Sequence, residues 1–247
     1  AYYNNELSPA PMPSFTLKNW EKEVVFQAMS HIWSEKFYNT IQNDLRNYKK
    51  SWWVYFYEWV KPGSEENMNA FDDAIWIKFD SDLYANFSKL YWVQYQDNSI
   101  YFNLVNNLDF NVDLSIDEII ELYKLKPKEE EVMAPPIDAT KTITDTLTSL
   151  NERELKVLVY INQAILNFII KSEWTQSFIT NNFWNQELFD VILNNRNEVL
   201  ADAIIQSEHD KIFITYGLLH FKWVLELLKQ NDPSWQINSS KYLYPIQ

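Results

Sequence analysis

Residues 211–220 read K-I-F-I-T-Y-G-L-L-H. The first six form a short β-branched and aromatic run, which is typical of a strand. Gly217 and then His220 follow it, so the predicted strand ends near a polar group. Two earlier segments have the same form: V-V-F-Q-A at 24–28 ends at Ser30 and His31, and W-V-Y-F-Y at 53–57 ends at Glu58. The sequence therefore predicts three strands, each followed by an ionisable side chain.

Helical patterns separate these strands. They cover residues 34–47, 83–91, 116–125, 155–170, 186–207 and 224–229. Ser115 with Glu118, and Ser149 with Glu152, have the spacing of capping boxes that open the third and fourth helices. Strands that alternate with helices predict an α/β fold with a mixed, partly parallel sheet flanked by helices.

The chain is expected to hold one domain. Residues 1–22 contain Pro and Asn and predict an extended lead-in, whereas residues 23–247 predict the single domain. The charged, Pro-rich stretch 126–145 is the best candidate for a linker within it. Residues 155–170 are the most apolar stretch, but they are too short and too often interrupted by polar residues to span a membrane. They predict a core helix instead, and any membrane anchor must lie outside this chain.

Composition excludes several classes of function. The 247 residues carry a formal net charge of -13, which disfavours binding to nucleic acid and to anionic lipid because both require an excess of Lys and Arg. The chain has no cysteine, so it has no disulfides and no Cys-ligated metal. A metal site in this chain must use histidine and carboxylate ligands.

Glycine is rare and tryptophan abundant. The chain has 2 Gly and 11 Trp, whereas ordinary composition gives roughly 17 Gly in this length. Seven Trp stand where a backbone commonly turns or approaches closely, which are positions that favour Gly: Trp33, Trp59, Trp76, Trp92, Trp174, Trp184 and Trp223. We interpret them as glycines of the natural protein, encoded by UGA and translated here as Trp, whereas Trp235 reads as authentic. The alternative is an aromatic-rich protein that binds glycans on Trp platforms.

The predicted strand ends carry a possible catalytic constellation. The carboxyl ends of strands in such sheets are where ligands bind, and they bear His31, Glu58 and His220. Neutral imidazole with carboxylate suits a divalent first-row metal, which can lower the pKa of bound water to about 7. The alternative is structural: histidines that only form hydrogen bonds, and a glutamate paired with a nearby cation. His209, in a predicted loop, is given no role, and Lys61 is at most a residue of the site rim.

The order of these motifs resembles the TraB/PrgY (GumN/TIKI-like) family, which is related to the TIKI metalloproteases. The matching segments are A-M-S-H at 28–31, Glu58, N-V-D-L-S at 111–115, R-N at 196–197 and G-L-L-H at 217–220. Glycine at position 223 extends the last to G-L-L-H-F-K-G. The chain departs from the family at Ala28, where Gly is usual, and at Gln96, which falls one position late for the family's G-x-x-Q.

This resemblance implies an EreA/ChaN-like architecture and a metal-dependent hydrolase that acts on peptides. It assigns a divalent metal of the Mn, Co or Zn type to His31, His220 and Glu58. Glu58 and Arg196 become the catalytic residues, the first as a base and the second orienting substrate or stabilising negative charge. Substrate contacts fall on Ser30, Gly217, Asn197 and Gln96. The alternative function is a non-catalytic protein that binds or sequesters a pheromone-like peptide. Separately, the alternative for Arg196 is a solvated residue on the helix surface next to Glu198.

Overall fold

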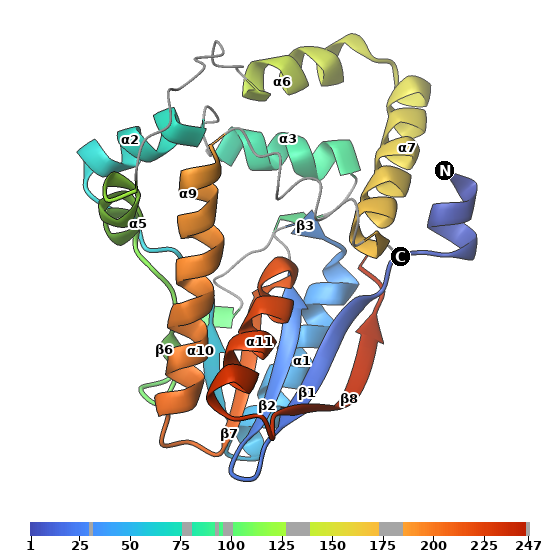
Figure 1. The fold of residues 1–247 in the computed structure, drawn as a ribbon. Helices are drawn as coiled ribbons and strands as arrows, with labels where there is room; N and C mark the ends of the chain where they lie inside the picture. Colours follow the sequence, from blue (N-terminus) through green and yellow to red (C-terminus); the bar gives the residue numbers. More distant parts are fainter. Residues whose placement is uncertain are drawn as a thin grey trace.

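The computed structural model describes residues 1–29, 32–75, 81–91, 94–95, 101–126, 139–172 and 185–245. A six-stranded sheet forms its centre, in the order β6-β4-β7-β2-β1-β8 (Figure 1). The strands are β1 (Met12–Lys18), β2 (Glu23–Met29), β4 (Val54–Tyr57), β6 (Phe110–Asn111), β7 (Lys211–Gly217) and β8 (Gln236–Leu243). A second, two-stranded sheet joins β3 (Ile32–Trp33) to β5 (Gln94–Tyr95).

The three strands predicted from sequence are neighbours in this sheet. Strand β7 lies between β2 and β4 and is parallel to both, with Ile212 paired to Val24 on one side and to Val54 on the other. Strand β6 is parallel to β4, whereas β1 is antiparallel to β2 and β8. The carboxyl ends of β2, β7, β4 and β6 therefore share one edge. The predicted mixed, partly parallel α/β sheet is confirmed.

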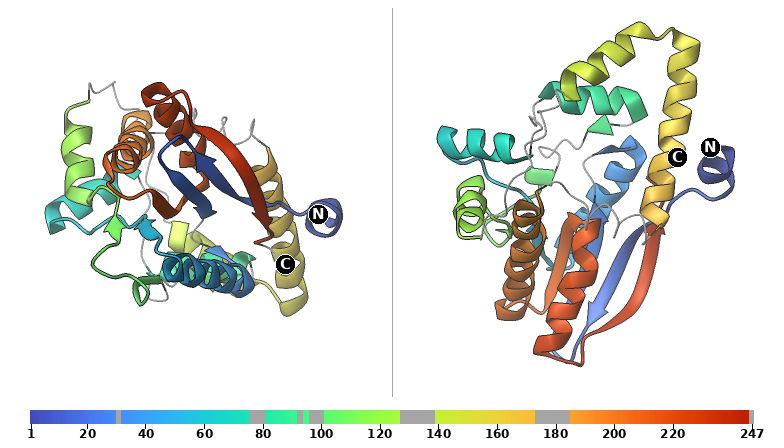
Figure 2. Two further views of the ribbon diagram at one scale, coloured as in Figure 1. Left: turned by 90° about the horizontal axis from the view of Figure 1, so that it is seen from below. Right: turned by 45° about the horizontal axis from the view of Figure 1, so that its top comes forward.

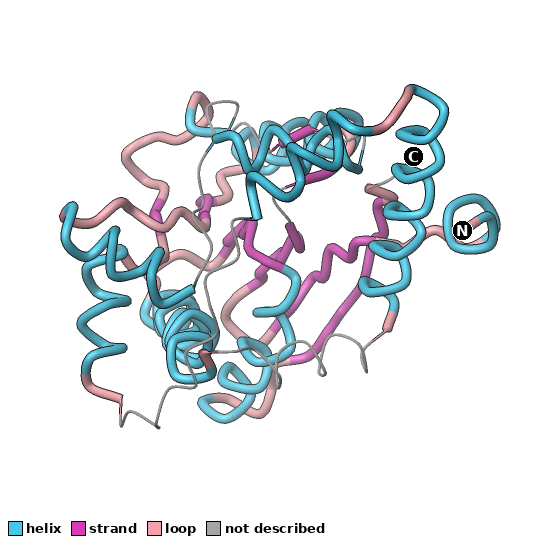
Figure 3. The backbone as a smooth tube through the Cα atoms, turned by 90° about the horizontal axis from the view of Figure 1, so that it is seen from above, coloured by secondary structure: helices cyan, strands magenta, loops and turns pink. Residues whose placement is uncertain are grey.

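Helices cover both faces of the sheet and lie beyond one edge. The α-helices of the described residues are α1 (Glu35–Lys50), α2 (Glu65–Ile75), α3 (Ser81–Tyr91), α5 (Ile116–Lys124), α6 (Ala139–Ser149), α7 (Glu152–Lys171), α9 (Gln186–Asp190), α10 (Arg196–Gln206) and α11 (Phe221–Asn231). Helix α1 lies on one face and α10 with α11 on the other (Figure 2). Helices α2, α3 and α6 lie beyond the edge where the parallel strands end, at the top of Figure 1. Seen from that side, helices surround the strands (Figure 3).

The main core lies between the sheet and these helices. Strand β7 is buried along its interior, as expected of a parallel strand with helices on both faces. Ile41 and Leu45 of α1 belong to this core, as do Leu200 and Ile204 of α10, and all four are fully buried. Apolar residues at helical spacing thus hold α1 and α10 against the sheet.

Residues 1–22 differ from the expected lead-in. They contain one π-helical turn, η1 (Tyr3–Leu7), and strand β1, which pairs along its length with β2 and β8. Met12 and Leu17 of β1 are buried in the main core. The three prolines at 9, 11 and 13 concealed this strand, because proline lacks an N–H and is unusual inside a sheet.

Helix α7 also differs from the sequence prediction. Asn151 with Glu154 forms its capping box, in place of the predicted Ser149 with Glu152. The expected core helix is largely a surface helix, with four apolar side chains 44–55% exposed: Val157, Ile161, Ile165 and Phe168. Among the described residues, no helix combines the length and apolar character that a membrane crossing requires.

The predicted linker coincides in part with a helix. Residues 127–138 lie outside the described residues, but α6 already begins at Ala139, inside the range 126–145. The capping box of α5 agrees with the sequence: Ser115 accepts from the Glu118 backbone N–H, and Glu118 accepts from the Ser115 N–H.

Candidate functional site

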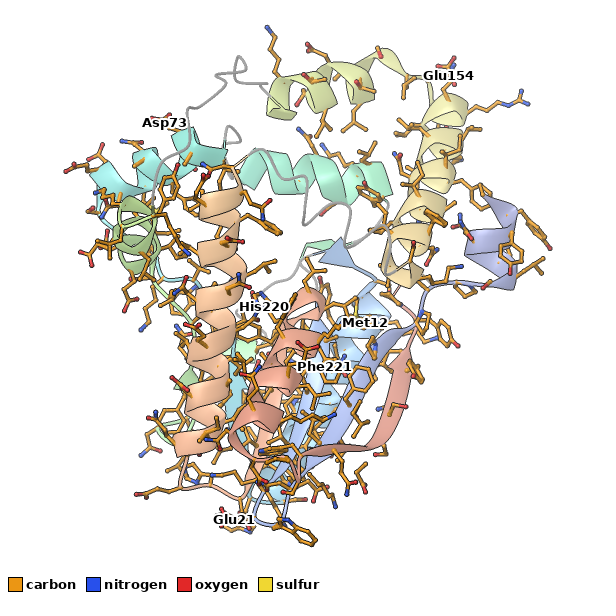
Figure 4. The ribbon with its side chains drawn as sticks, in the orientation of Figure 1. Met12, Glu21, Asp73, Glu154, His220 and Phe221 are labelled. Atoms are coloured by element: carbon orange, nitrogen blue, oxygen red, sulfur yellow. The ribbon has the colours of Figure 1, made fainter. Side chains whose placement is uncertain are left out.

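The carboxyl edge of the sheet brings together residues from three distant segments. Glu58 follows β4 directly, and its N–H donates to the Thr215 carbonyl at 3.2 Å. Gly217 ends β7, and His220 lies in the single 3₁₀ turn η3 (Leu218–His220) that connects β7 to α11 (Figure 4). Arg196 and Asn197 open α10 after the π-helical turn η2 (Val191–Asn195). Parallel pairing of β4 with β7 places Glu58 beside Gly217, and the ion pair with Glu58 brings Arg196 of α10 to the same edge.

The Glu58 carboxylate is fixed by two donors. Its Oε2 accepts from the Gly217 N–H at 2.6 Å, and its Oε1 accepts from Arg196 Nη2. The side chain is 17% exposed, so the carboxylate is close to the surface but not freely solvated. A backbone N–H and a guanidinium are both charge-assisted partners that favour the ionised carboxylate.

Arg196 is shared between two carboxylates. Its Nε and Nη2 donate to Asp113 Oδ1 and Oδ2 at 2.6 and 2.9 Å, a bidentate pair in which the Asp113 side chain is fully buried. Burial by itself lowers the pKa of Arg196, but Glu58, Tyr216 and Asp113 outweigh it and the pKa is raised. The guanidinium therefore stays charged and forms ion pairs with two carboxylates of the protein itself. It is buried, unlike the exposed helix residue of the alternative interpretation.

Asp113 is the site residue that sequence reasoning did not select. It follows β6, and burial raises the pKa of its carboxyl group against the opposing effect of Arg196. The Tyr216 hydroxyl also donates to Asp113 Oδ1, at 3.4 Å. The N-V-D-L-S segment at 111–115 was the available signal, but the partner of Asp113 is 83 residues away in the chain.

His220 is buried and neutral. Burial lowers the pKa of its imidazole to about 4, and the ring packs edge-on against Tyr216 with 4.8 Å between centroids. Its Nδ1 lies 2.7 Å from Asn197 Oδ1. With the Asn197 amide oxygen facing the ring, this hydrogen bond places the proton on Nδ1 and leaves a lone pair on Nε2, because an amide oxygen can only accept. Such a nitrogen can act as a metal ligand or as a general base.

Gly217 allows His220 and Glu58 to approach one another. A Cβ at this position would lie 3.2 Å from His220 Cδ2, 3.4 Å from Glu58 Oε2 and 3.7 Å from His220 Nε2. The backbone of Gly217 is extended, with φ at -56°, so the glycine is needed for space and not for a left-handed conformation. The imidazole and the carboxylate thus border the same small volume.

These two residues fit part of a metal site. An unprotonated imidazole nitrogen and an anchored carboxylate are donors suited to a divalent first-row metal. Among the residues that the structure describes, no group of three or more His, Asp or Glu side chains is arranged to hold a metal ion. His31, the third predicted ligand, lies outside the described residues, as do Ser30 and Gln96.

The remaining candidates lie elsewhere. His209 precedes β7, at the end of the strand opposite His220, and its ring is 6.2 Å from that of Phe110. Lys61 is exposed and forms a backbone bridge with Ser115, beyond Glu58. Comparisons of the chain with protein-family models, with curated proteins and with solved structures found no match.

Proposed function

We propose that this chain is a metal-dependent hydrolase that cleaves peptides. The observation that carries the proposal is the convergence of a neutral His220 imidazole and an anchored Glu58 carboxylate beside Gly217, at the edge where parallel strands end. Ligand sites of open α/β sheets occur at this edge. The peptide substrate is taken from the resemblance to TIKI-like proteins.

The residues present suit distinct tasks in such a reaction. His220 and Glu58, together with His31, would hold the metal, which when bound supplies Lewis acidity and a bound water of lowered pKa. Arg196 orients Glu58, because it forms an ion pair with the carboxylate and is itself held by Asp113. This makes Arg196 a positioning residue, since two carboxylates of the protein already occupy its guanidinium.

The test is peptide cleavage by the metal-free chain after addition of Mn²⁺, Co²⁺ or Zn²⁺, with a mixed peptide pool analysed by mass spectrometry. We expect new peptide termini with at least one metal, and a loss of roughly 100-fold or more in rate in Glu58→Gln and in His220→Asn. Glu208→Gln and His209→Asn are matched controls outside the site and retain the rate. Absence of cleavage with every metal, or cleavage that survives both site variants, contradicts the proposal.

A second candidate function is peptide binding without turnover. The described residues border a hollow of about 1190 Å³ beside Asn197 and Leu218, lined by α9, η2, α11 and β1. Its apolar lining includes Phe15, Phe189, Leu193, Leu219, Phe221 and Leu227. Metal-independent binding of peptides from the same pool, unchanged in Glu58→Gln and without cleavage, supports this function over hydrolysis.

A further inference from the structure

We propose that Asn197 is a positioning residue that holds His220 in the tautomer with its lone pair on Nε2. The proposal rests on the proposed function, because a metal ligand or base at Nε2 requires this tautomer. Asn197 is 1% exposed, and its Oδ1 faces His220 Nδ1 at 2.7 Å. Its neighbour Arg196 contacts Glu58. Two consecutive residues of α10 therefore form hydrogen bonds with the Glu58 carboxylate and the His220 imidazole, the two groups that border Gly217.

Among the described residues, the side-chain amide of Asn197 has no other hydrogen-bond partner. Its Nδ2 is buried and has no hydrogen-bond partner in the part of the chain that the structure describes. Within the described ranges, the hydrogen bond of this amide is therefore the one to His220. An amide turned by 180° would place Nδ2 on the imidazole Nδ1 and force the proton onto Nε2. The two orientations predict opposite tautomers.

Long-range ¹H–¹⁵N NMR of the metal-free, histidine-labelled chain distinguishes these tautomers. The sequence has three histidines, so His220→Asn assigns the signal. We expect protonated Nδ1 and unprotonated Nε2. A proton on Nε2 overturns the proposal. This result does not depend on metal or peptide, so it stands even if the proposed hydrolase activity fails.

Two variants separate positioning from packing. Asn197→Asp keeps an acceptor at Oδ1, and we expect it to retain the Nδ1-protonated tautomer and to bind Co²⁺ within a few-fold of the wild type. Asn197→Leu removes the acceptor, and we expect a loss of roughly 10- to 100-fold in Co²⁺ affinity. Equal affinities in the wild type and Asn197→Leu overturn the positioning role.

A different observation, at the C-terminus of α1, carries a second proposal. Trp52 has φ at 64°, and it is the one non-glycine residue with positive φ in the described part of the chain. The left-handed conformation crowds Cβ against the backbone, so it strongly favours glycine. The Trp52 side chain is 89% exposed, and burial therefore offers little compensation for this strain.

The hydrogen bonds around Trp52 identify the local motif. Its N–H donates to the Lys49 carbonyl at 3.1 Å, and the Trp53 N–H donates to the Tyr48 carbonyl at 3.2 Å. These two bonds define a Schellman motif, whose left-handed residue is usually glycine. The motif is often completed by an apolar contact across the turn, and the rings of Trp53 and Tyr48 make it at 4.7 Å.

We infer that position 52 is glycine in the natural protein and is encoded by UGA. The position joins the seven Trp predicted from sequence, of which Trp59 and Trp223 are 40% and 49% exposed. Trp53 packs in the Schellman motif and Trp235 is 3% exposed, so both are authentic tryptophans. A glycan-binding surface would explain why these Trp side chains are exposed, but it would not explain the left-handed backbone conformation of Trp52.

The gene and the natural protein test this inference together. We expect UGA at codon 52 and UGG at codons 53 and 235. In protein purified from its own cells, the tryptic peptide that begins at Ser51 covers positions 52, 53 and 59. We expect this peptide to read Ser-Gly-Trp at its start. UGG at codon 52, or Trp at that position in the peptide, overturns the inference.

The recombinant chain provides a physical test of the same claim. Trp52→Gly removes the left-handed strain, and we expect its Tm to rise by about 2–4 °C. Trp53→Gly is the matched control at the adjacent position, and it should lower the Tm because it removes the contact with Tyr48. A Tm that is unchanged or lower in Trp52→Gly contradicts the strain argument.

Discussion

Arg196 connects the two carboxylates of the site, the buried Asp113 and the partly exposed Glu58. It lies against Glu58 on one side and makes a bidentate pair with Asp113 on the other, and the cation and both anions are largely shielded from water. Charges in such surroundings depend strongly on their partners, because each isolated ion carries a large desolvation penalty. The geometry of Glu58 thus depends on a residue 138 positions later in the chain.

Removal of this cation is expected to destabilise the fold. Arg196→Met leaves Glu58 and Asp113 without their shared partner, and breaking a buried pair in this way costs about 3–5 kcal/mol. Urea unfolding at pH 7 measures the loss. Arg153→Met, at an exposed position of α7, is the matched control and should change the unfolding free energy little. A small effect of Arg196→Met contradicts the structural role of the triad.

His220 predicts a specific pH dependence of stability in the metal-free chain. Its pKa is about 4 when folded, whereas the reference value is 6.5. Between these values the unfolded chain binds a proton that the folded chain does not, so the stabilisation is complete above pH 6.5 and is lost as pH falls toward 4. Each pKa unit is worth about 1.4 kcal/mol, which gives a loss of about 3 kcal/mol.

His220→Asn isolates this contribution, because the variant has no imidazole at position 220. Urea unfolding at pH 7 and pH 4 measures the stability of the wild type and of the variant. Between pH 7 and pH 4 the wild type should lose about 3 kcal/mol more stability than the variant. A difference that is the same at both pH values contradicts a buried neutral imidazole.

At the scale of the elements, the N-cap of helix α7 can be tested by mutation. Asn151 accepts from the Arg153 and Glu154 N–H groups, whereas Ser149 ends α6 and donates to the Thr146 carbonyl. Asn151→Ala should cost about 1 kcal/mol of stability, and Ser149→Ala should cost little. Thermal unfolding of both variants checks this. A larger loss of stability in Ser149→Ala than in Asn151→Ala would contradict the observed cap and support the capping box predicted from sequence.

The elements also show what sequence reasoning could predict. The three strands that position the site were predictable, because their runs are short and rich in β-branched and aromatic residues, which favours a strand over a buried helix. Strand β1 was not, since its prolines mimic a loop and its partners β2 and β8 become visible only in three dimensions. The cap of α7 was misplaced by two residues because two capping-box patterns overlap at 149–154.

For the molecule as a whole, sheet order decides which residues can act together. Strand β7 lies between β2 and β4 and runs parallel to both. The carboxyl ends of all three strands therefore meet at one edge of the sheet (Figure 1). The pattern of strand ends predicted Glu58 and His220 at this edge, and the structure brings both beside Gly217. Arg196 was expected at this edge, but its pairing with Asp113 could not be predicted, because the two residues lie 83 positions apart in the chain.

The central claim is that Glu58 and His220 form one metal centre, and a double-mutant cycle of Co²⁺ affinity tests it most directly. Titration calorimetry compares the wild type, Glu58→Gln, His220→Asn and the double variant. The account predicts tight binding in the wild type, a large loss in each single variant and little further loss in the double variant, because shared ligands are not additive. Wild-type affinity in both single variants, or strictly additive losses, contradicts a shared centre.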